Sequence, residues 1–369
     1  MTKIHCKKEN LERAVITAER FTGKNAALPV LGNLLFEFRE NELFIAATNL
    51  EHAIEVSVPG ESAQFQQKRL TVPAKLLSSL VQSLSEETVQ LMEERGNLLV
   101  RTDTKNIRIQ GMSPDDFPLI PKIKKSHSFG IDALLLRVAL AQVLPAVSLS
   151  ELKPELAGVL WKISSQELKL AATDTFRLAE KTVALTPSKT KTDPLSFILP
   201  FRVAQEMERV FLQDGIVDVI FGENQIVVEW EGMKITSRCV DGNFPEYGGI
   251  VPTKFEAVAY VSRSALVNAI RASSLFSSKL QDVTLAFQGS LCEISSANQE
   301  IGEYRTTISV EKTGKDLTAS FSYRFLLDGL NAIEGDEVWW GINSENTPSL
   351  LRDKSDNTFL YIAMPIRLT

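Results

Sequence analysis

The sequence predicts an α+β protein built from three tandem copies of one domain. The chain has 369 residues, and a third of that length is a comfortable size for a single domain. Segments 32–58 and 158–184 share one pattern: they start at Gly, alternate apolar and polar residues, and reach Glu-Leu-x-(Ile/Leu)-Ala-Ala-Thr. A weaker copy occupies 283–310, so the pattern recurs about every 124 residues. This period is too long for a solenoid repeat and favours triplication of a whole domain.

Each copy is expected to begin with an amphipathic helix followed by antiparallel strands. Apolar residues recur at i, i+3 and i+4 within 8–24, 131–146 and 263–279, which is the spacing of a helix with one buried face. The alternation of apolar and polar residues with a period of two, inside the repeated segments, is typical of half-buried antiparallel strands. The first half of each copy is therefore predicted as a helix packed on a small sheet.

The second half of each copy is predicted to contain a short strand that runs into a second helix. These helices are expected at 73–84, 201–212 and 323–333. Pro73 and Pro200 stand at the first turn, where a missing backbone N–H costs nothing. A β-hairpin follows each of these helices, which completes the unit.

The domain limits are predicted from Pro- and Lys-rich stretches near 121–129 and 251–257. We therefore expect three α+β domains of one fold, at 1–125, 126–252 and 253–369.

The charge pattern changes a first reading of the composition. Apolar residues make up 44% of the chain and the formal net charge is −6, which describes a folded, mildly acidic protein and argues against a nucleic-acid binder. However, the six predicted helices hold twelve basic and seven acidic residues, a balance of +5, which leaves −11 for the rest. If the helices share one face of the molecule, that face is positive. An ordinary solvated helix surface is the alternative.

Residue types that carry most enzyme chemistry are sparse. The cysteines and histidines are Cys6, Cys239, Cys292, His5, His52 and His127. They form no CxxC or HExxH spacing, and no GxSxG or GxGxxG motif occurs. Gly23-Lys24 lacks the first Gly of a phosphate-binding loop, and Asp115-Asp116 lies among Pro and Ser, where a turn is the commoner role. We therefore expect no catalytic residue, no metal and no cofactor.

The sequence also gives no sign of export or membrane insertion. The N-terminal residues are charged and lack the apolar core of a signal peptide, and no apolar run approaches the ~20 residues that span a bilayer. A reducing cytoplasm is the expected compartment.

Four segments resemble the bacterial sliding clamp family, the beta subunit of DNA polymerase III. They are LPVLGNLLFEF (28–38), AATDTFRLAE (171–180), VDGNFPEY (240–247) and MPIRL (364–368), and the resemblance extends over essentially the whole chain. It implies the DNA clamp fold, with helices inside and antiparallel sheets outside, closing as a head-to-tail ring of two chains. It also implies a non-catalytic processivity factor that encircles duplex DNA without reading its sequence.

The resemblance further implies a set of partners. They are double-stranded DNA, a second copy of the chain, the DNA polymerase III alpha subunit, the clamp-loader complex, and other polymerases and repair proteins with clamp-binding motifs. No membrane partner is implied.

Candidate residues for DNA contact follow from the resemblance and from the positive helices. They are Arg20, Lys24, Asn25, Lys75, Arg137, Lys153, Arg202, Arg209 and Arg271. Their expected contacts are to phosphates, which would hold DNA weakly and without sequence readout. A Tyr pair that some clamps carry before Leu156 is replaced here by Pro154-Glu155.

The resemblance also implies a hydrophobic cleft that takes short Gln/Leu/Phe-type peptides from partner proteins. The matching positions are Leu156, Thr173, Thr175, Phe176, Arg177, Leu178, Pro245, Ile250, Ile362, Met364, Pro365, Ile366, Arg367 and Leu368. Gly249 stands where some clamps carry Arg. From the residues alone, without the resemblance, 364–368 reads as a final edge strand rather than as part of a cleft.

For ring closure, the resemblance implies apolar edges at Ile107 and Ile109 in the first domain, facing Leu275 and Phe276 in the third. Packing into the core of their own domains is the alternative. Two other readings of the whole chain also remain at this point, namely a scaffold that never binds DNA and a small-molecule-binding protein on the same triplicated fold.

Overall fold

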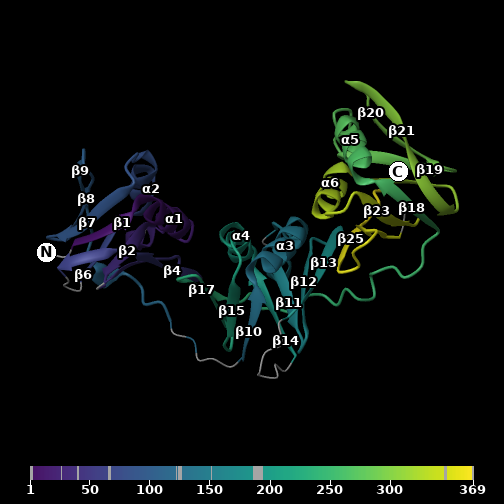
Figure 1. Cartoon of the computed structure of the whole chain (residues 1–369). Coiled ribbons are helices and arrows are strands. Elements are labelled where there is room, and N and C mark those ends of the chain that lie inside the picture. The colour runs from purple at the N-terminus through teal and green to yellow at the C-terminus, as the bar shows by residue number, and fades with distance from the viewer. Residues whose placement is uncertain are drawn as a thin grey trace. The chain divides into compact units, whose positions relative to one another are not determined.

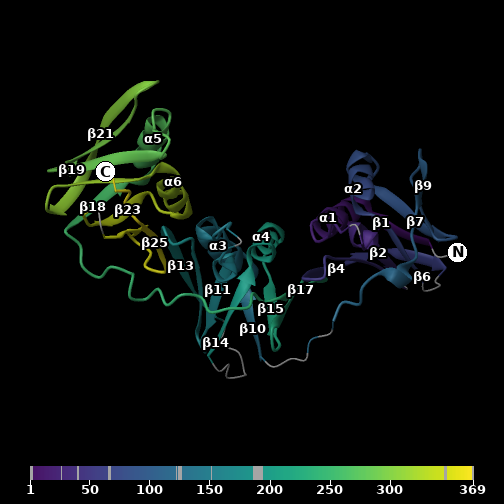
Figure 2. The same cartoon turned by 180° about the vertical axis from the view of Figure 1, so that it is seen from behind.

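The computed structural model describes residues 3–25, 27–39, 41–64, 68–121, 123, 127–150, 152–185, 194–344 and 347–367. Figure 1 traces these elements along the chain, and Figure 2 shows them from behind. Within the described residues the α-helices are α1 (Lys8–Glu19), α2 (Ala74–Ser83), α3 (Ala133–Val143), α4 (Phe201–Val210), α5 (Arg263–Ser274) and α6 (Tyr323–Ala332). The other elements are antiparallel strands and short 3-10 turns, which confirms the α+β class.

The repeated sequence segments fold as three equivalent three-stranded meanders. They are β2 (Asn33–Phe38), β3 (Glu42–Thr48) and β4 (His52–Pro59); β11 (Gly158–Ile163), β12 (Glu167–Thr173) and β13 (Arg177–Ala184); and β19 (Asp282–Gln288), β20 (Leu291–Asn298) and β21 (Gly302–Gly314). The register is preserved between copies, since Leu35 pairs with Ala46 and Leu160 pairs with Ala171. The strand before each second helix joins the first meander strand; these are β6 (Lys68–Pro73), β14 (Leu195–Pro200) and β22 (Leu317–Ser322).

The remaining strands complete the set of strands in each copy. In the first copy they are β1 (Lys3–Lys7), β5 (Glu61–Gln64), β7 (Thr88–Glu94), β8 (Asn97–Arg101) and β9 (Asn106–Gln110). In the second they are β10 (His127–Asp132), β15 (Ile216–Phe221), β16 (Gln225–Trp230) and β17 (Met233–Arg238). In the third they are β18 (Ala257–Ser262), β23 (Glu337–Ile342), β24 (Ser349–Asp353) and β25 (Phe359–Ala363). The hairpins predicted from sequence are thus confirmed in all three copies.

Two sheets run across the boundaries between copies. β17 pairs with β4 to give an eight-stranded sheet, and β25 pairs with β13 to give a twelve-stranded one. For this reason the chain divides into two compact units, one of residues 1–133 with 212–239 and the other of 134–211 with 240–369. The predicted domain limits stay a prediction, because the compact units follow the continuous sheets rather than the repeats.

The described helices end before their predicted C-terminal limits, and the difference is largest for α1 and α5. α1 ends at Glu19, where the Thr22 hydroxyl donates to the Glu19 carbonyl at 2.6 Å, and α5 ends at Ser274. Lys24 and Lys279 therefore lie beyond their helices. Nine basic and six acidic residues fall inside the helices as the structure bounds them, so the balance is +3 rather than +5.

The helices pack in pairs on the sheets and bury their apolar faces. α1 contacts α2 and α5 contacts α6, an arrangement visible in both views (Figures 1 and 2). Cys6 and Cys292 lie in the core, and burial raises the pKa of each thiol to about 12. Of the described helices, none is long and apolar enough to cross a membrane.

Candidate functional site

The candidate cleft begins at the turn between β12 and β13. The Thr173 hydroxyl donates to the carbonyl of Arg177 at 2.6 Å and accepts the N–H of Thr175 at 3.1 Å. The Asp174 carboxylate accepts the N–H groups of Phe176 and Arg177, each at 3.0 Å. These bonds hold Thr175 at a left-handed φ of 80°. The turn therefore presents the Phe176 side chain outward, with 60% of it exposed.

The C-terminal segment joins this turn through backbone hydrogen bonds. Arg177 pairs with Ala363 and Leu178 with Ile362 across β13 and β25. The next residue, Met364, donates its N–H to the Phe176 carbonyl at 2.8 Å. The tail leaves the turn after Met364, since Ile366 donates its N–H to the Ser320 carbonyl of β22 at 2.7 Å. The side chains from Met364 to Ile366 are half-buried, while Arg367 is exposed. Leu368 lies outside the described residues.

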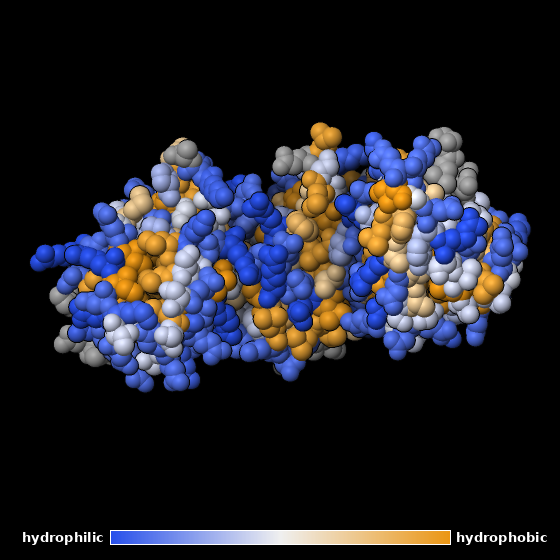
Figure 3. All heavy atoms as spheres, turned by 90° about the horizontal axis from the view of Figure 1, so that it is seen from above, coloured by the Kyte–Doolittle hydropathy of each residue, from blue (hydrophilic) through white to orange (hydrophobic). Residues whose placement is uncertain are grey.

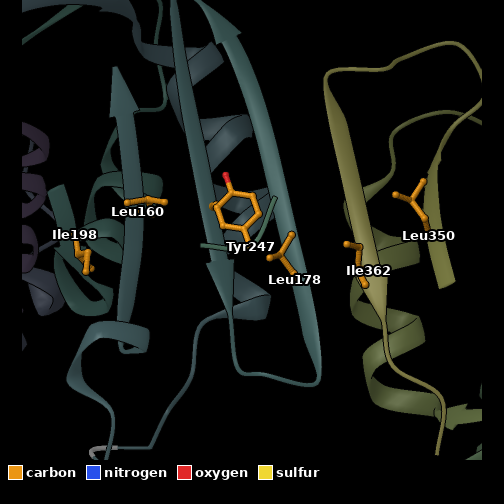
Figure 4. Close-up of a cluster of buried hydrophobic side chains, with 7 residues drawn as sticks. Leu160, Leu178, Ile198, Tyr247, Leu350 and Ile362 are labelled. Carbon is orange, nitrogen blue, oxygen red and sulfur yellow. The ribbon is translucent and has the colours of Figure 1, made fainter. Parts of the chain in front are cut away.

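A buried apolar cluster forms the floor beside this junction (Figure 4). Its members are Leu160, Ala171, Leu178, Ile198, Tyr247, Leu350 and Ile362. Burial, together with a 2.5 Å hydrogen bond from the Tyr247 hydroxyl to the Glu180 carboxylate, raises the pKa of that phenol. Pro245 and Ile250 lie exposed in the segment on either side of Tyr247. The arrangement is a packed floor with an exposed apolar rim, which suits an apolar anchor.

Arg177 is held rigidly at the base of the turn. Its Nε lies 2.9 Å from the Asp174 carboxylate, its Nη1 bonds Asp328 of α6, and its guanidinium stacks 4.3 Å from the Phe325 ring centroid. Burial alone lowers the pKa of this guanidinium, but Tyr361, Asp328 and Asp174 outweigh burial and raise it. The charge of Arg177 is thus already balanced inside the protein.

The structure places the other cleft candidates in two groups. Leu156, Thr173, Leu178 and Ile362 are buried, whereas Thr175, Phe176, Pro245 and Ile250 are exposed. Leu156 lies in a separate 3-10 turn (Pro154–Leu156) and is not part of the floor cluster. Sequence reasoning missed Leu160, Ile198 and Leu350, whose only sequence signal is their place in alternating strands. It also missed Asp328, since no local pattern links it to Arg177.

The candidate DNA-contact residues are almost all exposed. Arg20, Lys24, Asn25, Lys75, Lys153, Arg202, Arg209 and Arg271 have exposed side chains. Arg137 differs, because it is half-buried and its Nε donates to the carbonyl of Glu208 at 3.3 Å. Arg209 pairs with Glu206 at 2.7 Å. These two guanidiniums have acidic neighbours, which weakens their net attraction for phosphate.

The candidate dimer residues differ in exposure. Leu275 is 72% exposed just after α5, and Phe276 stacks on Tyr304 with ring centroids 6.0 Å apart. Ile109 is only 3% exposed, so it packs into its own domain, while Ile107 is half-exposed on the same strand. Among the described strands, that strand, β9, pairs with β8 alone. Figure 3 shows apolar patches separated by hydrophilic side chains on the face that it draws.

The motifs considered for catalysis have structural roles. The Ser113 hydroxyl accepts the N–H of Asp115 at the start of an exposed 3-10 turn, as expected for a turn. The N–H of Gly23 donates to the Leu31 carbonyl, and a side chain at Gly23 would meet Asn49. Among the described residues no group of three His, Cys, Asp or Glu side chains is arranged to hold a metal ion.

Comparison with known proteins covers the whole chain. The family models for the N-terminal, central and C-terminal domains of the DNA polymerase III beta subunit match residues 2–121, 131–246 and 249–367. The chain belongs to the DNA polymerase III beta subunit family. Membership makes it a sliding clamp of DNA replication, a processivity subunit that is not itself catalytic.

Individual clamps support this assignment at low sequence identity. The beta sliding clamp of Bacillus subtilis is 25% identical, with 99% of each chain covered, and that of Synechocystis is 26% identical, also with 99% of each covered. The solved DNA polymerase III beta subunit of Thermotoga maritima has a TM-score of 0.92 at 25% identity, and the Pseudomonas aeruginosa sliding clamp bound to griselimycin has 0.93 at 25%, each covering all of both chains. The predicted family and clamp fold are therefore confirmed.

Proposed function

We propose that two copies of this clamp join head to tail into a closed ring that encircles duplex DNA. The supporting observation is a pattern of strand pairing. Twice within the chain, the last strand of one copy pairs with the last meander strand of the preceding copy. These pairs are β17 with β4 and β25 with β13. The equivalent edges of β9 and of the first half of β21 have no such partner among the described residues. Joining β9 of one copy to β21 of another gives both edges the same pairing.

In this proposal the inner contacts to DNA are weak and mobile. The exposed cations on and beside the helices attract phosphates, while the net charge of −6 prevents tight binding elsewhere on the surface. Topology rather than affinity then keeps the ring on DNA. A cytoplasmic location is part of the proposal.

Retention on circular DNA tests the ring. Clamps loaded onto a nicked plasmid should stay bound at moderate salt and should leave when the plasmid is cut to a linear form. Equal retention on the two forms would rule out encirclement.

A substitution tests the interface between the two copies. Leu275→Asp should give a folded monomer in light scattering, because this exposed side chain does not pack into the core of its own domain. A dimer that is unchanged at micromolar concentration would contradict the proposed edge.

The cleft is proposed to tether the DNA polymerase III alpha subunit, the clamp loader, and other polymerases and repair proteins. Each would insert a short peptide of Gln, Leu and Phe over the apolar floor, against Met364 and the Phe176 turn. Deleting residues 364–369 should abolish binding of a labelled Gln/Leu/Phe peptide in fluorescence anisotropy and should leave the dimer intact. Peptide affinity that survives the deletion would refute the site.

A further inference from the structure

The first unit contains a hollow of about 580 Å³ that the proposed function does not use. It is lined by the turn at 48–53, by the segment at 118–121, and by Gln225, Thr236 and Arg238 from β16 and β17. All of these residues belong to one compact unit, so the hollow is a property of that unit alone.

The turn beside the hollow repeats the cleft turn bond for bond. The Thr48 hydroxyl donates to the His52 carbonyl at 3.0 Å and accepts the N–H of Leu50 at 3.1 Å. Asn49 replaces Asp174 and accepts the N–H groups of Glu51 and His52. Leu50 has a φ of 81°, against 80° for Thr175 of the cleft. A non-glycine residue in this region is uncommon, so its recurrence marks one turn design used twice.

The strand that follows is also placed as in the cleft. Arg238 donates its N–H to the Glu51 carbonyl at 3.0 Å, which matches the bond from Met364 to Phe176. Ala53 pairs with Thr236 where Leu178 pairs with Ile362 in the cleft. The hollow is therefore the counterpart of the cleft in the first copy of the repeat.

Smaller and more polar residues explain why this place is hollow. The Leu–Ile pair of the cleft floor is replaced by Ala53 and Thr236. Thr236 is 5% exposed, and its hydroxyl forms no hydrogen bond with any described residue. A buried polar group without a partner is costly, so the site favours a ligand that supplies a hydrogen bond there.

A cation lies on the same face of β17 as that hydroxyl, two residues further along the strand. Strand alternation puts Thr236 and Arg238 on the same face of β17, and Arg238 lies opposite Gln225 on β16. The Arg238 side chain is exposed and has no ion pair among the described residues. The opposite wall is apolar, formed by Leu50, Pro118 and Leu119, of which Leu119 is 91% exposed.

We propose that this hollow is a second binding site, for a short extended peptide that carries an aliphatic side chain followed by a carboxylate. The aliphatic group fills the space over Ala53 and contacts Leu50 and Pro118. The carboxylate accepts hydrogen bonds from the Arg238 guanidinium, the strongest pairing that the lining offers, and from the Thr236 hydroxyl on the same face of β17. Glu51 on the turn repels a second acidic group and so fixes the peptide direction. The idea rests on the proposed cleft only through the likeness of the two turns.

The test uses the full-length dimer and the labelled peptides Gly-Ala-Leu-Asp-Gly and Gly-Ala-Leu-Asn-Gly. Anisotropy titrations are made with Arg238→Gln and with Met364→Gln, the matched change at the equivalent position of the cleft. The Asp peptide should bind R238Q about tenfold more weakly than the wild type and should bind M364Q with wild-type affinity. The Asn peptide should bind the wild type more weakly than the Asp peptide does, and R238Q should not change its affinity. Thr236→Ile, which restores the residue of the cleft, should reduce binding of both peptides by filling the hollow.

Three results would overturn the proposal: no binding of the Asp peptide, equal binding of the Asp and Asn peptides, or weakening by M364Q instead of R238Q. The last result would mean that the probe occupies the cleft. A Gln/Leu/Phe peptide measured in parallel should respond in the opposite way to the two variants. Its failure to bind would count against the cleft and would leave the result for the Asp peptide standing.

Discussion

Replacing Arg177 by Ala should loosen the contact between the cleft turn and α6. The substitution removes the cation shared by Asp174 and Asp328 and the guanidinium stacked on Phe325. Breaking a buried ion pair costs about 3–5 kcal/mol, but the Asp328 side chain is 40% exposed and solvent screens it. Loss of the stacking adds about 0.5–1 kcal/mol. We therefore expect about 2–4 kcal/mol less local stability.

Hydrogen exchange followed by mass spectrometry measures this effect where it arises. A chain with three copies of a domain does not unfold in one step, so the midpoint of a global unfolding transition is a poor measure of this local effect. Exchange in peptides from α6 and β25 should accelerate roughly 30- to 700-fold, since each 1.4 kcal/mol is a factor of about ten. Peptides from α1 and α2 should exchange at the original rate and serve as the internal reference.

Two variants separate this contact from a general loss of charge. Arg177→Lys keeps the charge but loses the forked geometry and the stacking, so we expect about 1–2 kcal/mol. Arg324→Ala removes an exposed arginine from α6 and should change exchange by less than threefold. If R177A also changes exchange in α6 by less than threefold, the reasoning from the ion pairs is wrong.

Three further outcomes follow from single contacts. Tyr247→Phe removes the hydrogen bond to Glu180 and should cost about 1–2 kcal/mol of stability. Because the pKa of this phenol is raised in the folded state, the stability of the wild type should fall as pH rises above about 10. Urea titrations at several pH values should show a smaller fall for Y247F. Gly329→Ala should destabilise α6 by about 1–3 kcal/mol in the same exchange assay, despite the better helix propensity of Ala, because the new methyl would lie 2.4 Å from the Tyr361 ring. Iodoacetamide at pH 8 should modify Cys239 well before the two buried thiols, and rapid modification of all three would contradict the core packing.

The repeats were the strongest guide to the fold because strand alternation survives where identity does not. The segments at 32–58 and 158–184 fold with the same register, as their alternation predicts. The predicted helix ends were less accurate. Arg20 and Lys24 continue the helical sequence pattern, but α1 ends at Glu19, whose carbonyl accepts the Thr22 hydroxyl. Local pattern alone carries no signal for such a side-chain cap.

The site was predicted in part, for a physical reason. The turn residues lie within segment 171–180 and the tail within 364–368, and the structure brings the turn and Met364 together. Arg177 and Asp328 are 151 residues apart, so only the fold shows that they pair. For Ile109, packing into its own domain was the alternative left open by the sequence, and the structure selects it.

The pairing of β13 with β25 has a mechanical consequence. Five residue pairs from Arg177–Ala363 to Lys181–Phe359 join the second copy of the repeat to the third in a single continuous sheet. Motion at this boundary has to twist the continuous sheet, because a hinge motion would first have to break the backbone hydrogen bonds between β13 and β25. The connection between β13 and β25 should therefore be stiff and elastic. A force applied to a peptide bound at Met364 would then deform the backbone of both copies at once.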